Sequence, residues 1–232
     1  MRKPSIAVIL CGGFGTRMAQ YANDLPKPLV PVLGKPIVSH IIDNLRRNGI
    51  KQFVLLTGYK HEKFCQTFEH DNSILIVDTL PGTDTADRLK LAQKFINSED
   101  FLLTYGDSII DFNLFKASSI IGDSYGMAVF KRQLSYGVVE IDNEVKITKF
   151  SEKPVFYCNA GHYILSKKIF ADSRLLAARN LEREYFPLLI ADPGECPPVK
   201  AFEVSIHETI DSGEDVLRFE NKYSGYDVLP WH

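Results

Sequence analysis

The sequence predicts an α/β fold, because short apolar runs alternate with segments of helical periodicity over the first hundred residues. The run from Ile6 to Leu10 is continuously apolar and ends at glycines, as expected of a central strand buried on both faces. Between Pro36 and Gly49 the spacing becomes helical. The apolar residues of that amphipathic helix are Ile37, Ile41, Ile42 and Leu45.

The remaining elements follow in chain order. The pair of strands at 138–141 and 145–150 is joined at Asp142-Asn143 like a hairpin, so the sheet is expected to turn mixed or antiparallel in the second half. We find no repeat or linker, which predicts a single domain, 1–232, with a substrate-facing lobe after about residue 110. Further strands are predicted at 53–57, 74–77, 101–105, 127–131, 161–165 and 201–206, and further helices at 87–96, 182–191 and 214–223.

Composition excludes several classes of protein. The chain has 232 residues, 45% hydrophobic and 24% charged, which is the balance of a globular domain. Its 27 basic and 29 acidic residues give a formal charge of −2, which argues against a nucleic-acid partner. The four cysteines form no CxxC pair, so neither a zinc site nor a disulfide framework is expected. The sequence shows neither a signal peptide nor an apolar run long enough for a membrane span, and we expect a cytoplasmic protein.

A glycine-rich turn, Cys11-Gly12-Gly13-Phe14-Gly15-Thr16-Arg17, follows the first predicted strand. Backbone N–H groups in such a turn can approach a phosphate. A P-loop would need a Gly-Lys pair here, and a dinucleotide fingerprint would need glycine where Met18 stands. The nearby cations Arg17 and Lys27 suit a polyphosphate. The turn alone leaves two interpretations open: phosphate binding, and a plain glycine turn with solvated charges.

Other motifs accompany this turn in a fixed order. They are Pro26-Lys27-Pro28, Gly34-Lys35-Pro36, Thr85-Ala86-Asp87-Arg88, Tyr105-Gly106-Asp107, Tyr136-Gly137-Val138-Val139, Glu152-Lys153-Pro154, Asn159-Ala160-Gly161 and Ile210-Asp211-Ser212-Gly213. The series resembles that of the sugar-1-phosphate nucleotidyltransferases over nearly the whole chain, and it looks most like the glucose-1-phosphate cytidylyltransferase branch. The resemblance implies the nucleotide-diphospho-sugar transferase fold, a Rossmann-like three-layer sandwich with a mixed, mostly parallel central sheet and a small antiparallel sugar-binding lobe.

The resemblance also implies how the nucleotide is held. Residues 1–110 would form the nucleotide-binding half and 111–232 the sugar-phosphate-binding half. Arg17 and Lys27 would be the catalytic cations, Arg17 against the departing β and γ phosphates and Lys27 against the α-phosphate. An exposed loop lysine is the plainer interpretation of Lys27. The nucleotide-binding residues implied are Cys11, Gly12, Gly13, Gly15, Thr16, Thr85 and Gly106.

A metal ion and a sugar phosphate are implied in the same way. Asp107 and Asp211 would together hold Mg²⁺, which prefers one or two carboxylates with water and substrate oxygens. A Gly-Asp pair can also be a simple turn former. The sugar phosphate would contact Gly137, Glu152, Lys153 and Asn159. A surface Glu-Lys pair, of little energetic value, is the plainer alternative for two of these residues.

The expected reaction transfers a nucleoside monophosphate from a triphosphate to a sugar 1-phosphate and releases pyrophosphate, with CTP as the first choice and guanylyl, uridylyl or thymidylyl transfer as alternatives. Relatives carry Thr-Gly-Gly-Arg where this chain has Thr85-Ala86-Asp87-Arg88, and this departure bears on the base. A second hypothesis is a non-catalytic, nucleotide-sugar-binding regulatory subunit of the same fold. Arg17, Lys27, Asp107 and Asp211 are all present, which favours the enzyme. A homo-oligomer is also left open.

Overall fold

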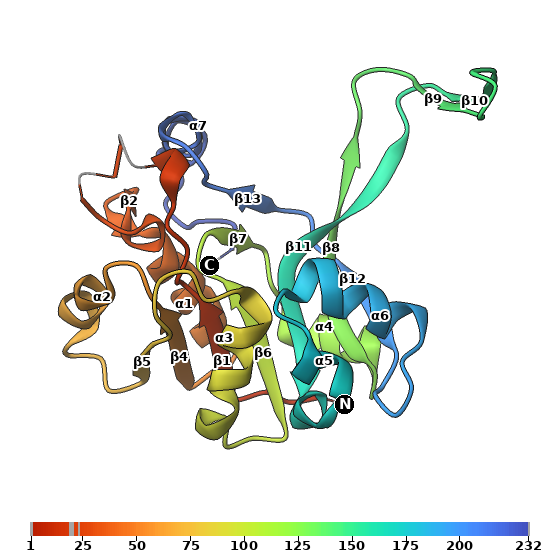
Figure 1. Ribbon diagram of the computed structural model, residues 1–232. Coiled ribbons are helices and arrows are strands. Elements are labelled where there is room, and N and C mark those ends of the chain that lie inside the picture. The colour runs from red at the N-terminus through yellow and green to blue at the C-terminus, as the bar shows by residue number, and fades with distance from the viewer. Residues whose placement is uncertain (1, 19–20, 23, 232) are drawn as a thin grey trace.

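The protein is built on a seven-stranded sheet with helices on both faces (Figure 1). The computed structural model describes residues 2–18, 21–22 and 24–231, with Arg17 described in its backbone only. From one edge to the other the strands are β12 (Val199–Glu203), β8 (Tyr125–Gln133), β11 (Val155–Ser166), β6 (Asp100–Tyr105), β1 (Ile6–Leu10), β4 (Gln52–Thr57) and β5 (Ile74–Asp78).

Strand direction confirms the predicted mixed, mostly parallel sheet. β1 pairs in parallel with both β4 and β6, and β12 pairs in parallel with β8. Only β11 is reversed within this sheet, since it is antiparallel to both β6 and β8. The carboxyl ends of β1 and β6 therefore meet at one edge, which is where open α/β sheets bind ligands.

The core lies in two layers, one on each face of the sheet. Side chains of β1 alternate between them, because successive residues of a strand point to opposite faces. Ala7 and Ile9 belong to one cluster, while Ile6, Val8 and Leu10 belong to the other. The first layer contains α1 (Ile37–Arg47), α2 (His61–Phe68), α4 (Leu114–Ile121) and α7 (Gly213–Tyr223), and the second contains α3 (Thr85–Ala92), α5 (Ser173–Ala177) and α6 (Phe186–Ala191).

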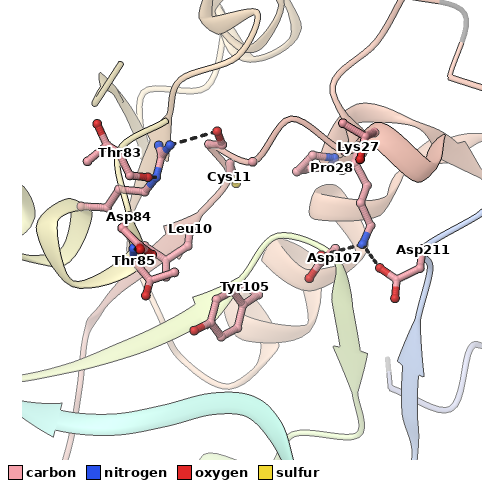
Figure 2. Close-up of a pocket in the computed structure, with 15 residues that line it drawn as sticks. Leu10, Cys11, Lys27, Pro28, Thr83, Asp84, Thr85, Tyr105, Asp107 and Asp211 are labelled. Atoms are coloured by element: carbon pink, nitrogen blue, oxygen red, sulfur yellow. Dashed lines mark hydrogen bonds and ion pairs between the residues drawn. The ribbon is translucent and has the colours of Figure 1, made fainter. Parts of the chain in front are cut away.

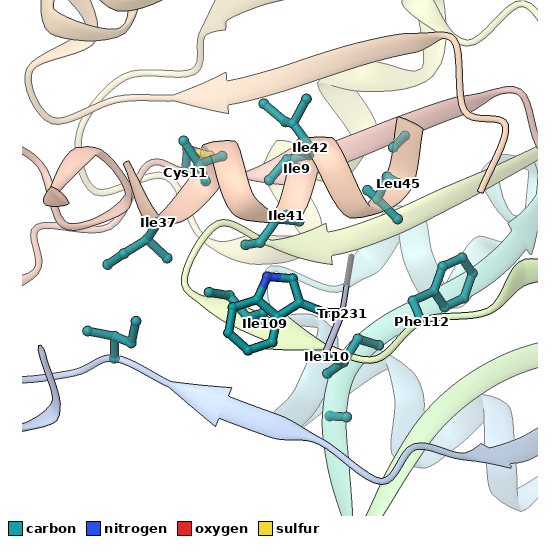
Figure 3. Close-up of a cluster of buried hydrophobic side chains, with 14 of the residues drawn as sticks. Ile9, Cys11, Ile37, Ile41, Ile42, Leu45, Ile109, Ile110, Phe112 and Trp231 are labelled. Carbon is teal, nitrogen blue, oxygen red and sulfur yellow. The ribbon is translucent and has the colours of Figure 1, made fainter. Parts of the chain in front are cut away.

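Trp231 closes the first layer against α1 and α7. Its ring lies 4.7 Å from that of Tyr223 and 5.3 Å from that of Phe219, and the side chain is 3% exposed. Figure 3 shows the indole beside Ile41 of α1 and beside Ile109. The last described residue of the chain is thus part of the main hydrophobic core.

Several helices differ from their predicted positions. α1 was predicted correctly, whereas α3 begins at Thr85 rather than at 87, because the Asp84 carboxylate accepts from the Thr85 N–H and caps the helix two residues earlier. The helices α2 and α4 were not predicted, because each has only eight residues and α2 buries a single apolar side chain, Phe64. Such short patterns give little periodic signal.

Strand β11 is longer than the five residues predicted at 161–165. It begins at Val155, and its register with β8 shifts between Asn159 and Tyr163, where Gly161 has a φ of +73°. The bulge breaks the alternation of side chains, and this hid the first half of the strand from a search by period. β8 and the first half of β11 rise beyond the sheet as a two-stranded ribbon (Figure 1).

This ribbon carries the hairpin of β9 (Val138–Ile141) and β10 (Ile147–Ser151), which pair antiparallel and confirm the predicted turn between them. We call residues 133–157 the arm, and Figure 1 shows it projecting away from the body. Two smaller sheets complete the fold: β2 (Pro31–Val32) with β3 (Lys35–Pro36), and β7 (Ser108–Ile110) with β13 (His207–Thr209). Among the described residues, we find no helix of the length and apolar character needed to cross a bilayer.

Candidate active site

A cavity of about 420 Å³ opens where β1 and β6 end. Its floor is the glycine-rich turn, and its walls come from the segment before α3, from the end of β6 and from Asp211 (Figure 2). Nine of the residues that the sequence implied for the site line this cavity together. These are Cys11, Gly12, Gly13, Gly15, Thr16, Lys27, Thr85, Asp107 and Asp211.

Two of the three glycines of the turn, Gly12 and Gly15, are required by close approaches. A Cβ on Gly12 would lie 1.5 Å from Nη1 of Arg88, and a Cβ on Gly15 would lie 2.9 Å from Cβ of Lys27. Gly15 also has a φ of +60°, which side chains rarely adopt. Thr16 begins a 3₁₀ turn that includes Arg17, whose side chain lies outside the described part of the chain. The role implied for Arg17 stays a prediction.

Arg88 is the buried residue that fixes this turn, although the sequence analysis gave it no role. The residue is 4% exposed, its guanidinium donates to five neutral oxygens, and burial lowers its pKa. The guanidinium thus ties the turn to the end of β4 and to the loop before α3. The acceptors are the carbonyls of Gly12, Thr57, Leu80 and Thr83 and the hydroxyl of Thr79.

Lys27 lies between two carboxylates. Its Nζ donates to Oδ2 of Asp107 at 2.7 Å and also to Oδ1 of Asp211, and its side chain is only 11% exposed (Figure 2). The two acids come from elements far apart in sequence, since Asp107 follows β6 and Asp211 precedes α7. Carboxylate oxygens from both acids therefore converge on the position of the Lys27 ammonium, beside the glycine-rich turn.

Cys11 and Gly106 support the floor of the cavity. Burial, followed by the nearby Asp107, raises the pKa of the Cys11 thiol, so the thiol is a packing group and not a nucleophile. Gly106 donates its N–H to the Leu10 carbonyl, and a Cβ there would lie 2.7 Å from the Cys11 sulfur. Gly106 thus lets β6 pass close under the turn.

The segment around Thr85 contains the two residues, Ala86 and Asp87, at which the sequence departs from the Thr-Gly-Gly-Arg motif. The Thr85 hydroxyl accepts from the Leu181 N–H at 2.9 Å and donates to Glu182 at 3.1 Å, so it is already engaged. Ala86 is fully buried in the core, and Asp87 pairs with Lys90 at 2.7 Å on the outer side of α3. Neither of the two substituted side chains lines the cavity, and both are accommodated by the helix.

A second cavity, of about 430 Å³, adjoins the first through Asp211. Its walls combine two arginines and three acids, Glu208, Asp211 and Asp215, with a stacked pair of rings, since Phe130 lies 3.9 Å from His207. Arg132 reaches it from the end of β8 and Arg218 from α7. Because one acid lines both cavities, a ligand in the second would lie beside the Lys27 ammonium.

Three of the residues implied for the sugar phosphate, Gly137, Glu152 and Lys153, lie in the arm beside the β9–β10 hairpin, and Asn159 lies nearer the sheet on β11. A Cβ on Gly137 would lie 3.1 Å from Oε2 of Glu152, and the Lys153 carbonyl accepts from Gln133. Asn159 donates to the Tyr163 hydroxyl at 2.6 Å. None of these described residues lines the cavity that holds Lys27. The structure thus brings Gly137 and Glu152 together, and the role implied for this group stays a prediction.

Sequence reasoning missed other lining residues besides Arg88. They are Leu10, Pro28, Thr83, Asp84 and Tyr105, which all lie in or beside motifs already singled out. The Tyr105 hydroxyl is buried and has no hydrogen-bond partner among the described residues. Arg88 could have been found from the sequence, because helical spacing places it on the same side of α3 as Leu89 and Ala92, which are buried.

Comparison with known proteins decides the family. The family profile described as nucleotidyl transferase matches residues 6–186, which is most of the chain. The chain belongs to the nucleotidyl transferase family.

Individual relatives agree with this membership. A Bacillus subtilis protein described as a "Probable glucose-1-phosphate cytidylyltransferase" is 35% identical over 193 residues, covering 71% of this chain and 76% of its own. The D-glycero-alpha-D-manno-heptose 1-phosphate guanylyltransferase of Campylobacter jejuni is 34% identical over 180 residues, covering 73% and 79%. The crystal structure of HddC from Yersinia pseudotuberculosis superposes with a TM-score of 0.71 at 25% identity, covering 94% of this chain and 99% of that one. This likeness confirms the predicted fold.

Proposed function

We propose that this nucleotidyl transferase moves a nucleoside monophosphate from a triphosphate to a sugar 1-phosphate, with CTP as the first-choice donor. One observation carries the proposal: the Lys27 ammonium is held between Asp107 and Asp211 at the mouth of the glycine-rich turn. The names of the Bacillus and Campylobacter relatives support a sugar 1-phosphate as acceptor. The same two names leave cytidylyl and guanylyl transfer as alternatives.

The reaction would place an oxygen of the sugar phosphate on the α-phosphorus. The bond from that phosphorus to the oxygen bridging the α and β phosphates breaks, and pyrophosphate leaves with the electron pair. Positioning and charge neutralisation are the main requirements. The backbone of Gly12 and Gly13 would hold the phosphates, and Lys27 would neutralise charge at the α-phosphate, with Arg17 proposed for the departing phosphates.

Asp107 and Asp211 fit a magnesium ion. Their carboxylates converge on one cation in the structure, and two carboxylates completed by water and phosphate oxygens are a usual Mg²⁺ environment. When bound, the ion would supply charge neutralisation on the phosphates. The two acids would then hold the ion, and Lys27 would contact phosphate.

The acceptor would bind in the second cavity, beside Asp211. Arg132 offers a cation to a dianionic phosphate monoester, Arg218 offers a second that is shared with Asp215 at 2.8 Å, and the ring pair of Phe130 and His207 offers a flat surface for a sugar. Arg132 is also on the strand that leads into the arm, where Glu152 and Lys153 are the proposed contacts to the sugar phosphate. The cavity and the arm would thus line one binding path for the acceptor.

Pyrophosphate release tests the proposal. The full chain is assayed in Mg²⁺ with ATP, CTP, GTP, UTP and dTTP against a panel of hexose and heptose 1-phosphates. We expect release with CTP and at least one sugar, and its loss in Asp107→Asn. Glu214→Gln, an exposed acid three residues beyond Asp211 that lies outside the cavity lining, is the matched control and should keep full activity. No pyrophosphate release in any pairing would overturn the proposal. Release with GTP alone would show that GTP, and not CTP, is the donor.

A further inference from the structure

The cavity that holds Lys27 has charged groups at both ends. The Lys27 ammonium lies with Asp107 and Asp211 at one end, and the Asp84 carboxylate lies at the other, immediately before α3 (Figure 2). Figure 2 shows Cys11, at the start of the glycine-rich turn, between these two groups. A triphosphate held by the turn and by Lys27 would therefore direct its base toward Asp84.

Two N–H groups hold one oxygen of the Asp84 carboxylate in place. Its Oδ1 accepts from the Thr85 N–H at 2.7 Å, as the cap of α3, and from Nδ2 of Asn180 at 2.8 Å. The Asn180 amide is oriented in turn, because its own Oδ1 accepts from the Arg183 N–H at 2.8 Å. Asp84 and Asn180 are 96 residues apart, so two separate segments of the chain fix this carboxylate.

The second oxygen, Oδ2, is available to a ligand. It has no hydrogen-bond donor in the described part of the chain, and Asp84 is a half-buried residue of the cavity lining. Asp84 also forms no ion pair with any described residue. An ionised carboxylate accepts hydrogen bonds and donates none. A ligand at this end of the cavity therefore meets a fixed, negatively charged acceptor, which favours an N–H donor and repels another acceptor.

The pyrimidine bases differ in what they offer to such an acceptor. Cytosine carries the exocyclic N4 amino group, which donates, whereas uracil and thymine carry the O4 acceptor at the same position. The one N–H donor on that edge of uracil and thymine lies between two carbonyl oxygens, so a carboxylate oxygen that approached it would be repelled on both sides. The charge and position of Oδ2 therefore favour cytosine.

We propose that Asp84 selects the base of the donor nucleotide, because its Oδ2 accepts from the amino group of cytosine and repels O4 of uracil and thymine. The inference rests on the proposed function, since it takes the cavity as the site of a nucleoside triphosphate. Asp84 is the acid of this segment that faces the ligand, because Asp87 pairs with Lys90 outside the cavity lining.

Calorimetry of the full chain with CTP and with UTP, in Mg²⁺, tests the selection without turnover. We expect the wild type to bind CTP about tenfold to a hundredfold more tightly, the usual effect of one hydrogen bond to a charged group. Asp84→Asn should reverse the preference, because its amide NH₂ donates to O4 of uracil and not to the amino group of cytosine. Asparagine also caps a helix as well as aspartate does, and thermal melting checks that the variant is folded.

Asp87→Asn is the matched control, since it neutralises an acid of the same helix turn outside the cavity lining, and it should keep the wild-type preference. Pyrophosphate release with one sugar 1-phosphate gives a second measurement, in which the ratio of kcat/KM for CTP and UTP should follow the ratio of affinities.

Equal affinity of the wild type for CTP and UTP would overturn the inference, as would a failure to bind either of them or a preference that Asp84→Asn leaves unchanged. The proposed function can fail separately. A preference for CTP that depends on Asp84, in a protein that releases no pyrophosphate, would overturn the proposed reaction and support the selection of the base.

Discussion

The guanidinium of Arg88 occupies the space that a side chain on Gly12 would fill. Nη2 of Arg88 donates to the Gly12 carbonyl at 2.9 Å, and the guanidinium lies against the glycine's α-carbon on the side where a Cβ would project. The glycine and the arginine are 76 residues apart in sequence. The shape of the glycine-rich turn therefore depends on α3 as well as on the turn's own residues.

Arg88→Lys should loosen this turn, because a lysine has three donors at one point and cannot reach five separate oxygens. We expect a loss of about 3 kcal/mol in the free energy of unfolding, since buried carbonyls lose their donors. Nucleotide affinity should fall with it. Chemical denaturation and calorimetry with the triphosphate measure the two effects. Arg183→Lys, which changes an exposed arginine outside the cavity lining, is the control. Equal changes in unfolding free energy and nucleotide affinity in the two variants would show that Arg88 does not fix the turn.

Gly12→Ala should reproduce the effect of Arg88→Lys, because the new methyl group displaces the guanidinium. The two changes disrupt one contact, so the double variant should lose much less than the sum of the single losses. A double-mutant cycle measured by denaturation gives the coupling. Strictly additive losses would mean that the two residues act separately.

Lys27→Met should reduce kcat by roughly 10²–10³-fold, the usual loss when one preorganised donor to the transition state is removed. Methionine keeps the length of the side chain and removes the charge, so the Asp107 and Asp211 carboxylates lose the cation between them. Steady-state kinetics with saturating magnesium measure the change. Lys116→Met, on the exposed side of α4, should be unaffected, and an unchanged kcat in Lys27→Met would exclude the proposed role.

The central elements could be predicted from the sequence, because burial on both faces leaves a strong pattern. β1 is a five-residue apolar run, and α1 has a clear helical period bounded by proline and glycine. The edge of the sheet at which Asp107 emerges also followed from the order of strand and turn. Nine residues taken from the motifs line one cavity at this edge, and their part in nucleotide binding stays a prediction.

The arm could not be placed from the sequence, since a hairpin pattern indicates which strands pair and not the direction in which they leave the sheet. The bulge at Gly161 interrupts the alternation that would have revealed the full length of β11. The partnership of Arg88 with Gly12 was equally hidden, because side-chain hydrogen bonds over long sequence separations leave no local period. Spacing also gave no sign that Lys27 would stand between the two acids.

Trp231→Ala should cost about 3–5 kcal/mol of stability, the usual loss for a fully buried aromatic side chain. Its ring packs on Phe219 and Tyr223, so its removal opens a cavity between α7 and α1. Urea denaturation followed by far-ultraviolet circular dichroism measures the loss. Phe115→Ala removes an aromatic side chain that is 77% exposed and should change stability by less than about 0.5 kcal/mol. Similar losses in both variants would contradict the packing of Trp231.

Stability should fall as the pH drops from 7 toward 4, because His162 is buried in its neutral form. Burial lowers the pKa of His162 to about 4, and the unfolded chain has the ordinary value of 6.5. The unfolded state therefore binds more protons between these two values, and the stabilisation present above pH 6.5 is lost as the pH falls toward 4. One such group costs about 2 kcal/mol by pH 5. Burial also lowers the pKa of His207, which adds to the same trend.

His162→Gln separates this group from the others that titrate. Glutamine fills a similar space and takes up no proton, so the decrease in unfolding free energy between pH 7 and pH 5 should shrink by about 2 kcal/mol. Urea denaturation at several pH values measures the slope. His70→Gln is the matched control, because the His70 side chain is 92% exposed and its removal should leave the slope unchanged. If His162→Gln keeps the wild-type slope, the acid sensitivity arises from other groups, His207 first among them.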